Sequence, residues 1–387
     1  MSENKNQFNV SLNEEQSILQ QSVRQFAENE IKPFVLELDE AQKFPIDIVE
    51  KMGNAGFLGA TIPEQYDGSG MSISDFVIIM KEISKIDASI GLILAAHHGL
   101  CLSHLFSFSN EEQKKKYIPE LATGKKIGAW CLTEPFSGSD ASGMKSRAVR
   151  NGDHYILNGT KNFITNASYA STFVVICIVE NEGKKKHTAF IVEKNYEGVS
   201  IAKKENKLGM RASDTAQVVF SDVKVPIENR LGEEGDGFKQ SLKVLDGGRI
   251  GIAALSLGII EGCLEASIKY AKERNQFGKS LSEFQATQWK IADMSTQLEA
   301  AKFLTFQAAY LKDNGKPFGK EASYAKLFAS ELACSASSEA IQIHGGYGYI
   351  KEFPVEKFYR DAKLLTIGEG TSEIQRLVIA RYLLNEI

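Results

Sequence analysis

The chain has 387 residues, enough for two or three domains around a large core. Its 45 Lys and Arg residues face 49 Asp and Glu residues, and the net charge of −4 argues against nucleic acid as the main partner and against a polybasic membrane anchor. The five cysteines include no CxxC and the six histidines no HExxH, so neither a disulfide framework nor a metal site is predicted.

The first residues show neither an apolar h-region nor an Arg-rich amphipathic pattern, so no signal or transit peptide is expected. No apolar run approaches the roughly 18 residues of a membrane span. We therefore expect a cytoplasmic protein that uses no membrane.

Residues 1 to about 128 have mostly helical patterning. Asn13-Glu14-Glu15-Gln16 and Asn110-Glu111-Glu112-Gln113 have the form of a capping box, which predicts helix starts. Residues 74–105 are long, apolar and nearly unbroken, which indicates a helix buried on all sides.

The pattern becomes β-rich at about residue 129. Short runs of β-branched and aromatic residues occur at 147–149, 154–157, 173–176, 188–192 and 216–220. Turns are predicted at 151–153, 158–159 and 181–183, where Asn and Gly cluster.

Helical periodicity returns from Gly237, over 238–273, 282–313, 318–344, 352–365 and 372–385, which is typical of a helix bundle. The predicted fold class is therefore α+β. We divide the chain into an N-terminal helical domain (1–128), a middle β domain (129–232) and a C-terminal helical bundle (233–387).

The most informative segment is Gly368-Glu369-Gly370-Thr371-Ser372, a tight turn between two helical stretches. A carboxylate between two glycines stands on a bare backbone, which a flat ligand can approach closely. Taken alone, the segment is more simply a helix N-cap at Thr371 or Ser372 with Glu369 in solvent.

Five other segments have small, polar or glycine-rich patterns. They are residues 130–140, 158–166, 246–249, 274–279 and 342–348. Each has an ordinary structural interpretation as a turn or a helix end. The Gly-Gly-Tyr-Gly sequence at 345–348 follows no strand, so it is not a Rossmann fingerprint.

In this order and separation, the six motifs resemble the acyl-CoA dehydrogenase family, closest to its short-chain (butyryl-CoA) members. The resemblance covers nearly the whole chain. It implies an N-terminal helical domain, a β-barrel-like middle domain and a C-terminal four-helix bundle. It also implies the cofactor FAD, an electron-transferring flavoprotein as partner, and a homotetramer built as a dimer of dimers.

The resemblance assigns roles to individual residues. Glu369 would be the catalytic base. Substrate contacts would come from Ser139, Asp246, Arg249 and Gly370. FAD contacts would come from Trp130, Cys131, Leu132, Thr133, Ser139, Phe163, Ile164, Thr165, Arg274, Phe277, Gln285, Gln342, Ile343, His344, Gly345, Gly346, Thr371, Ser372 and Glu373.

Two positions bear on these roles. Phe163 stands where the family usually has Trp, and so keeps a stacking surface but lacks the indole N–H. Gly248 stands where one subgroup of the family places its catalytic Glu, so the base has to be Glu369.

The implied reaction is removal of an α-proton by Glu369 and hydride transfer to flavin N5, which converts a short acyl-CoA to trans-2-enoyl-CoA. The segment 88–98 contains no Arg to pair with a second carboxylate, which argues against a glutaryl-type substrate, and no Asp or Glu that could serve as a second base. Branched-chain or alicyclic substrates, an acyl-CoA oxidase, a flavin monooxygenase and a non-catalytic binding relative remain as alternatives.

Overall fold

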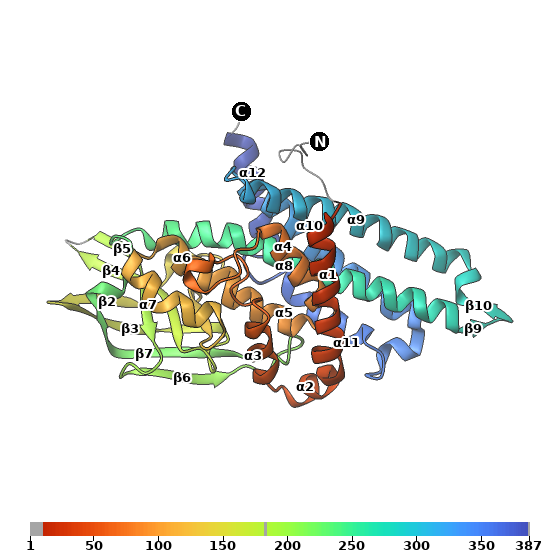
Figure 1. Ribbon diagram of the computed structural model, residues 1–387, viewed down its shortest axis with the longest axis horizontal. Helices are drawn as coiled ribbons and strands as arrows, with labels where there is room; N and C mark the ends of the chain where they lie inside the picture. The colour runs from red at the N-terminus through yellow and green to blue at the C-terminus, as the bar shows by residue number, and fades with distance from the viewer. Residues whose placement is uncertain (1–10, 182–183, 386–387) are drawn as a thin grey trace.

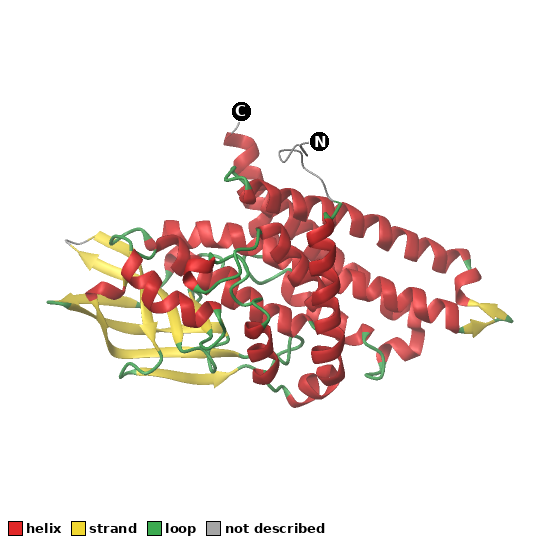
Figure 2. Cartoon of the chain, viewed as in Figure 1, coloured by secondary structure: helices red, strands yellow, loops and turns green. Residues whose placement is uncertain are grey.

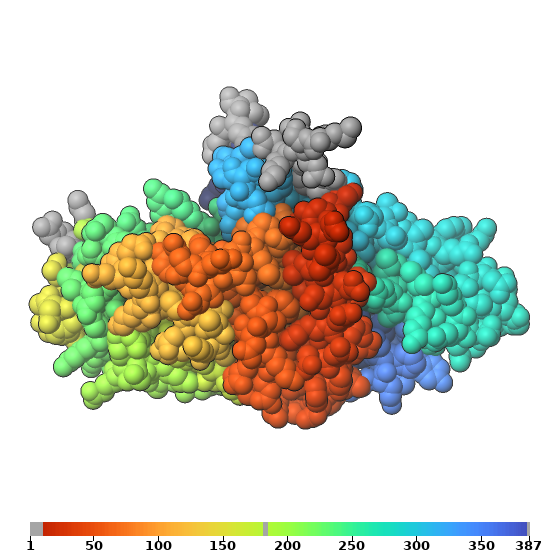
Figure 3. Space-filling view, in the orientation of Figure 1, coloured from red at the N-terminus to blue at the C-terminus, as the bar shows by residue number. Residues whose placement is uncertain are grey.

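The computed structural model describes residues 11–181 and 184–385 of the chain. N-terminal helices lie at the front of the molecule, between a β-sheet at one end and long C-terminal helices at the other (Figures 1 and 2). The space-filling view shows the same order of segments along the long axis (Figure 3). The predicted α+β fold class is confirmed, whereas the domain boundaries at 128 and 232 remain our own division.

The N-terminal part is helical, as predicted. Its elements are α1 (Glu14–Phe26), π-helix η1 (Ala27–Ile31), α2 (Val35–Ala41), α3 (Ile46–Asn54), α4 (Ile73–Ile86), α5 (Ala88–Leu94), π-helix η4 (Ala95–Leu102), α6 (Ser103–Phe108) and α7 (Glu111–Ala122). Both predicted capping boxes form, at Asn13 before α1 and at Asn110 before α7. Each satisfies two backbone donors that a helix start leaves open.

Two helical segments have the length and hydropathy of a membrane span, contrary to our expectation that no apolar run is long enough. They are Ala88–Phe108 and Gly237–Glu273. In both, 78% of the apolar window is buried inside the protein, as in the core helices of a folded domain.

The middle part is one eight-stranded sheet in the order β6-β7-β3-β2-β4-β5-β8, with β1 paired to β4. The strands are β1 (Gly128–Cys131), β2 (Arg147–Asn151), β3 (His154–Thr165), β4 (Thr172–Asn181), β5 (Lys184–Glu193), β6 (Val199–Lys204), β7 (Thr215–Pro226) and β8 (Arg230–Leu231). In β4, Phe173 and Val175 face a core inside the sheet, whereas Val174 and Ile176 face the N-terminal helices. The sheet therefore curls around one core and uses its other face as a docking surface.

The predicted turn at 158–159 is wrong, because β3 continues through it as a bulge. The Asn158 side chain pairs with Asp222 on β7, and a Cβ on Gly159 would lie 2.2 Å from the Ser146 hydroxyl. Tertiary contacts therefore keep Asn158 and Gly159 in an extended conformation, although this pair favours a turn in isolation. The predicted turn at 181–183 lies partly outside the described residues.

The C-terminal part is a bundle of long helices. It comprises α8 (Gly237–Glu273), a hairpin of β9 (Asn275–Gln276) and β10 (Lys279–Ser280), α9 (Gln285–Asp313), α10 (Gly319–His344), the 3₁₀ turn η8 (Gly345–Tyr349), α11 (Val355–Leu365) and α12 (Ser372–Asn385). Helix α8 crosses α4 closely, because a Cβ on Gly258 would lie 2.5 Å from the Lys81 carbonyl oxygen. The two helical parts consequently share one core.

Three buried histidines lie on the N-terminal helices, and two of them, His97 and His104, bond to the middle and C-terminal parts. His97 accepts from the Gly128 N–H and donates to the Leu121 carbonyl; His98 accepts from the Thr61 hydroxyl and donates to the Leu58 carbonyl. His104 accepts from the Trp130 indole and donates to Gln240. Burial lowers their pKa values to about 4, 3 and 4, so all three are neutral at pH 7.

Because these pKa values lie below that of an unfolded histidine, they predict a loss of stability between about pH 6.5 and pH 4 as the unfolded state takes up protons. The free energy of unfolding in urea, measured from pH 7.5 to 5 for the wild type and for His98→Gln, isolates the contribution of one of these histidines. The advantage of the wild type should shrink by about 1.4 kcal/mol per pH unit below 6.5. A difference that does not vary with pH would contradict this origin.

Candidate active site

Glu369 lies in the turn that joins α11 to α12. Its φ is 54°, in the left-handed region, and Gly370 follows at 89°. A non-glycine residue in that region carries a strain on the order of 1 kcal/mol or more, and the surrounding structure has to hold it there.

Two side chains hold this turn by its carbonyl oxygens. Gln375 Nε2 donates to the oxygens of Glu369 (3.2 Å) and Gly370 (3.0 Å), and Lys326 Nζ donates to that of Gly370 (2.7 Å). Thr371 caps α12, because its hydroxyl accepts from the Ile374 N–H at 3.3 Å. The N-cap interpretation therefore holds for Thr371, but Glu369 does not point into solvent.

The Glu369 carboxylate lies against the backbone of α8. Its Oε2 atom is buried and has no hydrogen-bond partner among the described residues. A Cβ on Gly248 would lie 2.1 Å from that oxygen, so only glycine leaves room for it. Burial raises the pKa of Glu369 to about 7, although the nearby Lys326 and Arg249 oppose this shift.

Arg249, the residue after Gly248 on α8, is fixed by polar partners. Its Nη1 contacts Asp246 Oδ1 at 2.6 Å and donates to the Ser323 hydroxyl at 3.1 Å. The pair Asp246 and Arg249 lies within α8 rather than at its start, which is Gly237. The structure thus brings two of the predicted substrate contacts close to Glu369.

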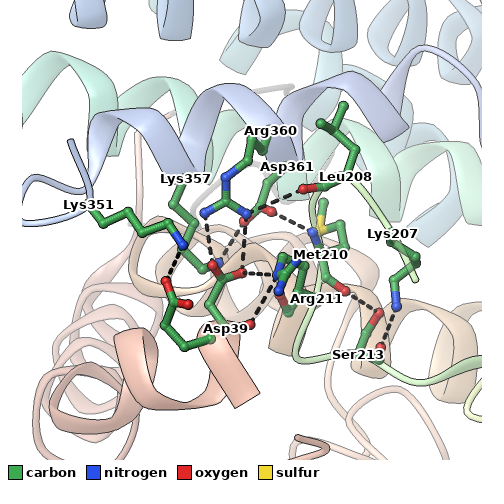
Figure 4. Close-up of polar contacts among 12 residues, drawn as sticks. Asp39, Lys207, Leu208, Met210, Arg211, Ser213, Lys351, Lys357, Arg360 and Asp361 are labelled. Atoms are coloured by element: carbon green, nitrogen blue, oxygen red, sulfur yellow. Dashed lines mark hydrogen bonds and ion pairs between the residues drawn. The ribbon is translucent and has the colours of Figure 1, made fainter. Parts of the chain in front are cut away.

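Helix α11, which leads into the turn, is anchored to both other parts of the chain (Figure 4). Lys357 lies between Asp87 (3.1 Å) and Asp361 (2.7 Å), and all three are buried. Asp361 also accepts from the Met210 N–H at 2.5 Å, and Arg360 pairs with Asp39 at 2.8 Å.

These contacts reach the N-terminal helices and the loop before β7 at once. Removing one partner of a buried pair is costly, so they fix the position of α11. The position of Glu369 follows from it.

A second group of predicted residues lies beside β3. The Lys161 ammonium contacts Glu134 at 2.8 Å, and the Asn162 N–H donates to the Thr133 carbonyl at 2.8 Å. Burial disfavours the ionised form of Glu134. The contacts of this carboxylate, with Lys161 first among them, outweigh the effect of burial, and the pKa of Glu134 is lowered. Thr133 is thereby held next to Phe163 and Thr165.

Phe163 is the exposed member of this group. Its side chain is 60% exposed and its φ is 56°, in a second bulge of β3. Ile164, by contrast, is buried, and so are the side chains of Trp130, Cys131 and Leu132. Trp130 and Cys131 can therefore offer a ligand little more than their backbone groups, whereas Phe163 presents a free aromatic face.

A third group lines a cavity of about 380 Å³ at the far end of the bundle. It contains Arg274, Ile343, His344, Gly345 and Gly346, which the sequence assigned to one ligand. The Arg274 guanidinium lies over the Tyr347 ring, 5.4 Å from its centre. A Cβ on Gly345 or Gly346 would meet nothing within 4 Å, so the backbone there is open to a ligand.

The remaining predicted residues lie on the surface around these groups. Phe277, at the tip of the β9–β10 hairpin, is 94% exposed, and Ser139, Gln285, Gln342 and Glu373 are exposed as well. Ser372 is buried beneath the turn. Within one chain the hairpin and the sheet lie at opposite ends of the molecule, so the second and third groups do not meet (Figure 1).

Comparisons with known proteins agree with this arrangement. The family models described as the N-terminal, middle and C-terminal domains of acyl-CoA dehydrogenase match residues 13–125, 129–223 and 235–384. The chain belongs to the acyl-CoA dehydrogenase family. It is an oxidoreductase with the fold that the sequence predicts.

Individual relatives are similar over their full length. A short-chain-specific acyl-CoA dehydrogenase of Clostridium acetobutylicum is 48% identical, over 96% of this chain and 99% of its own. The caffeyl-CoA reductase-Etf complex subunit CarC of Acetobacterium woodii is 45% identical, over 96% and 99%.

Three solved structures have the same fold. Butyryl-CoA dehydrogenase of Megasphaera elsdenii matches with a TM-score of 0.94 and 42% identity, over 97% of this chain and 99% of its own. A chain from the structure of the electron transferring flavoprotein of Acidaminococcus fermentans matches with a TM-score of 0.95 and 45% identity, over 97% of this chain and 99% of its own. An acyl-CoA dehydrogenase of Bacillus anthracis complexed with FAD matches with 0.92 and 33%, over 99% and 69%.

Sequence reasoning missed the residues that hold the Glu369 turn of this dehydrogenase in place. Lys326 and Gln375 support the turn, and Lys357 with Asp87 and Asp361 anchors α11. Each lies on a helix at an unremarkable position. The only local signal was a charge inside an otherwise apolar helical stretch, and a solvated face explains such a charge equally well.

Gly248→Ala should lower dehydrogenase activity by at least about tenfold, because the new methyl group displaces the Glu369 carboxylate. Gly251→Ala, on the same helix, is the matched control: its Cβ would meet only Phe76, at 3.9 Å. Steady-state rates and thermal unfolding of both variants test this. Equal activities of the two variants would show that Gly248 is not needed for the carboxylate.

Proposed function

We propose that this protein binds FAD and oxidises a short, uncharged acyl-CoA to the trans-2-enoyl-CoA, with Glu369 as the base that removes the α-proton. The observation that carries the proposal is the Oε2 atom of Glu369, which is buried and has no hydrogen-bond partner in the part of the chain that the structure describes. Burial raises the pKa of this carboxyl group to about 7. A base with that pKa is about half ionised at neutral pH, and its ionised form can accept a proton from carbon.

The turn also supplies a donor for the substrate. Among the described residues, the Glu369 N–H donates to none, because the hydrogen bonds of the turn come from its neighbours Ile367, Gly368 and Ser372. A thioester carbonyl placed at this N–H would be polarised, which lowers the pKa of the α-proton toward that of Glu369. Bound FAD would supply the hydride acceptor.

The residues present suit FAD. Phe163 offers an exposed ring for stacking, and the half-buried Thr133, Thr165 and Thr371 offer hydroxyl and backbone groups. The cavity lined by Arg274 and Gly345–Gly346 combines a guanidinium with an open backbone, which suits a pyrophosphate. The FAD-bound relative from Bacillus anthracis supports the same cofactor.

Because one group lies in the sheet and the other beside the β9–β10 hairpin, with the N-terminal helices between the two elements, we infer that a single FAD contacts both only if a second copy supplies one of them. The 94% exposed Phe277 at the hairpin tip fits such a contact. The outer faces of α9 and α12 also expose large apolar side chains, namely Trp289, Phe303, Leu377 and Leu384. These features support a homotetramer formed as a dimer of dimers.

A short acyl group suits the environment of Glu369. The Leu100 side chain lies 3.1 Å from the position of a Cβ on Gly248, so it closes the space beside the carboxylate. Residues 88–96 are buried, and none of them is charged. The short-chain relative and butyryl-CoA dehydrogenase support this size. CarC and the Acidaminococcus structure support an electron-transferring flavoprotein as partner.

A second candidate function is the reverse reaction, reduction of an enoyl-CoA. The 45% identity with CarC, a subunit of a caffeyl-CoA reductase complex, favours it. Proton transfer is reversible, so the same Glu369 would then deliver the proton to the α-carbon.

An anaerobic titration of the purified protein with butyryl-, octanoyl-, isobutyryl-, isovaleryl- and cyclohexanecarboxyl-CoA tests the proposal. We expect butyryl-CoA to bleach the oxidised flavin band. Bleaching only by a branched or cyclic acyl-CoA would indicate a branched-chain or alicyclic substrate instead of a short straight one. Rapid peroxide formation in air without another acceptor would indicate an oxidase, and reduction of crotonyl-CoA by the reduced enzyme with no measurable oxidation would favour the reductase.

Glu369→Gln should retain FAD and bind acyl-CoA, but lose flavin reduction by about a thousandfold or more, because the amide cannot accept the α-proton. Stopped-flow reduction by butyryl-CoA measures the rate, and the flavin spectrum with a non-reducible analogue measures binding. Reduction at a near-normal rate would refute Glu369 as the base.

The rate of flavin reduction should rise with pH through about 7 and then level, because only the ionised form of Glu369 can take the proton. The pH dependence of the rate at low acyl-CoA concentration gives the midpoint for the substrate-free enzyme. A rate that is flat from pH 5.5 to 8 would contradict a base with a raised pKa.

A further inference from the structure

Lys326 lies on α10 beneath the catalytic turn, and its side chain is fully buried. Its Nζ donates to the Gly370 carbonyl at 2.7 Å. Among the described residues, no carboxylate oxygen lies within ion-pair distance of this Nζ. A buried ammonium that contacts only a neutral carbonyl is costly, and burial lowers the pKa of Lys326 to about 8.

The charged groups that face this ammonium come from three other elements. They are Glu369 in the turn, Arg249 on α8 and Glu373 on α12, together with Glu331 on α10 itself. Glu331 is paired with Arg376, and Arg249 with Asp246. Glu369 is therefore the group on which the unneutralised charge of Lys326 acts most directly.

Resting on Glu369 as the base, we propose that Lys326 is a positioning residue for it. Its ammonium holds the Gly370 carbonyl, which keeps Glu369 in the left-handed conformation, and its charge favours the ionised carboxylate. Without it, the buried carboxylate would be protonated more readily and would aim less accurately at the α-carbon.

Gln375 separates these two effects. Its Nε2 donates to the same Gly370 carbonyl at 3.0 Å, but it carries no charge. Removing Gln375 loosens the turn only, whereas removing Lys326 loosens the turn and also removes a positive charge beside the base.

The test is the pH dependence of anaerobic flavin reduction by butyryl-CoA, from pH 5.5 to 8.5, in the full-length FAD-loaded enzyme. Lys326→Met should move the midpoint of the rise in rate to higher pH by about one unit. At acidic pH this makes flavin reduction about tenfold slower. Lys326→Arg should restore the midpoint. Gln375→Met should lower the plateau without moving the midpoint. Lys363→Met, which removes an exposed charge on α11, should change neither.

A Lys326→Met midpoint equal to that of the wild type would overturn the proposal. If this variant retains no FAD, Lys326→Gln takes its place and has the same two outcomes. A failure of the proposed function itself would give a different result. Glu369→Gln would then still reduce its flavin, and the rate of the wild type would show no rise with pH for Lys326 to shift.

Discussion

Burying one carboxylate without a hydrogen-bond partner is the constraint on which the site depends. Glu369 loses hydration and gains no donor for Oε2, so the surrounding structure has to offset the cost. It does so with a left-handed turn held by its carbonyl oxygens, and with a glycine on α8 that leaves space for the oxygen. The same burial raises the pKa of the carboxylate to about 7, which suits the role of base that we propose for it.

The cost is met by contacts that come from all parts of the chain. Helix α11 carries Lys357, Arg360 and Asp361, which reach the N-terminal helices and the loop before β7. Gly209 in that loop packs on the backbone of Arg360, where a Cβ would lie 2.4 Å from its carbonyl oxygen. The turn that follows α11 is therefore positioned by the whole assembly, although it is only a few residues long.

The arrangement of the other two groups bears on the homotetramer that we propose. Phe163 and Phe277 are both exposed aromatic rings on residues with positive φ. Phe163 belongs to the sheet and Phe277 to the β9–β10 hairpin, and the N-terminal helices lie between these two elements (Figure 1). Exposure of such rings is unfavourable in an isolated chain and is relieved when a cofactor or a second copy covers them. This supports a cofactor site shared between copies.

The sequence by itself determined the order of the helices and strands and the six motifs, since periodicity and motif spacing are local properties. Glu369 as the base stays a prediction from the family resemblance. The sequence also identified the residues around Arg274 and His344, which the structure brings into one cavity. Only the tertiary structure decided that Asn158-Gly159 continues a strand, that Trp130 donates to His104, and that Lys326 holds the turn. Each of these depends on a partner far away in the chain, and local residue preferences contain no information about such a partner.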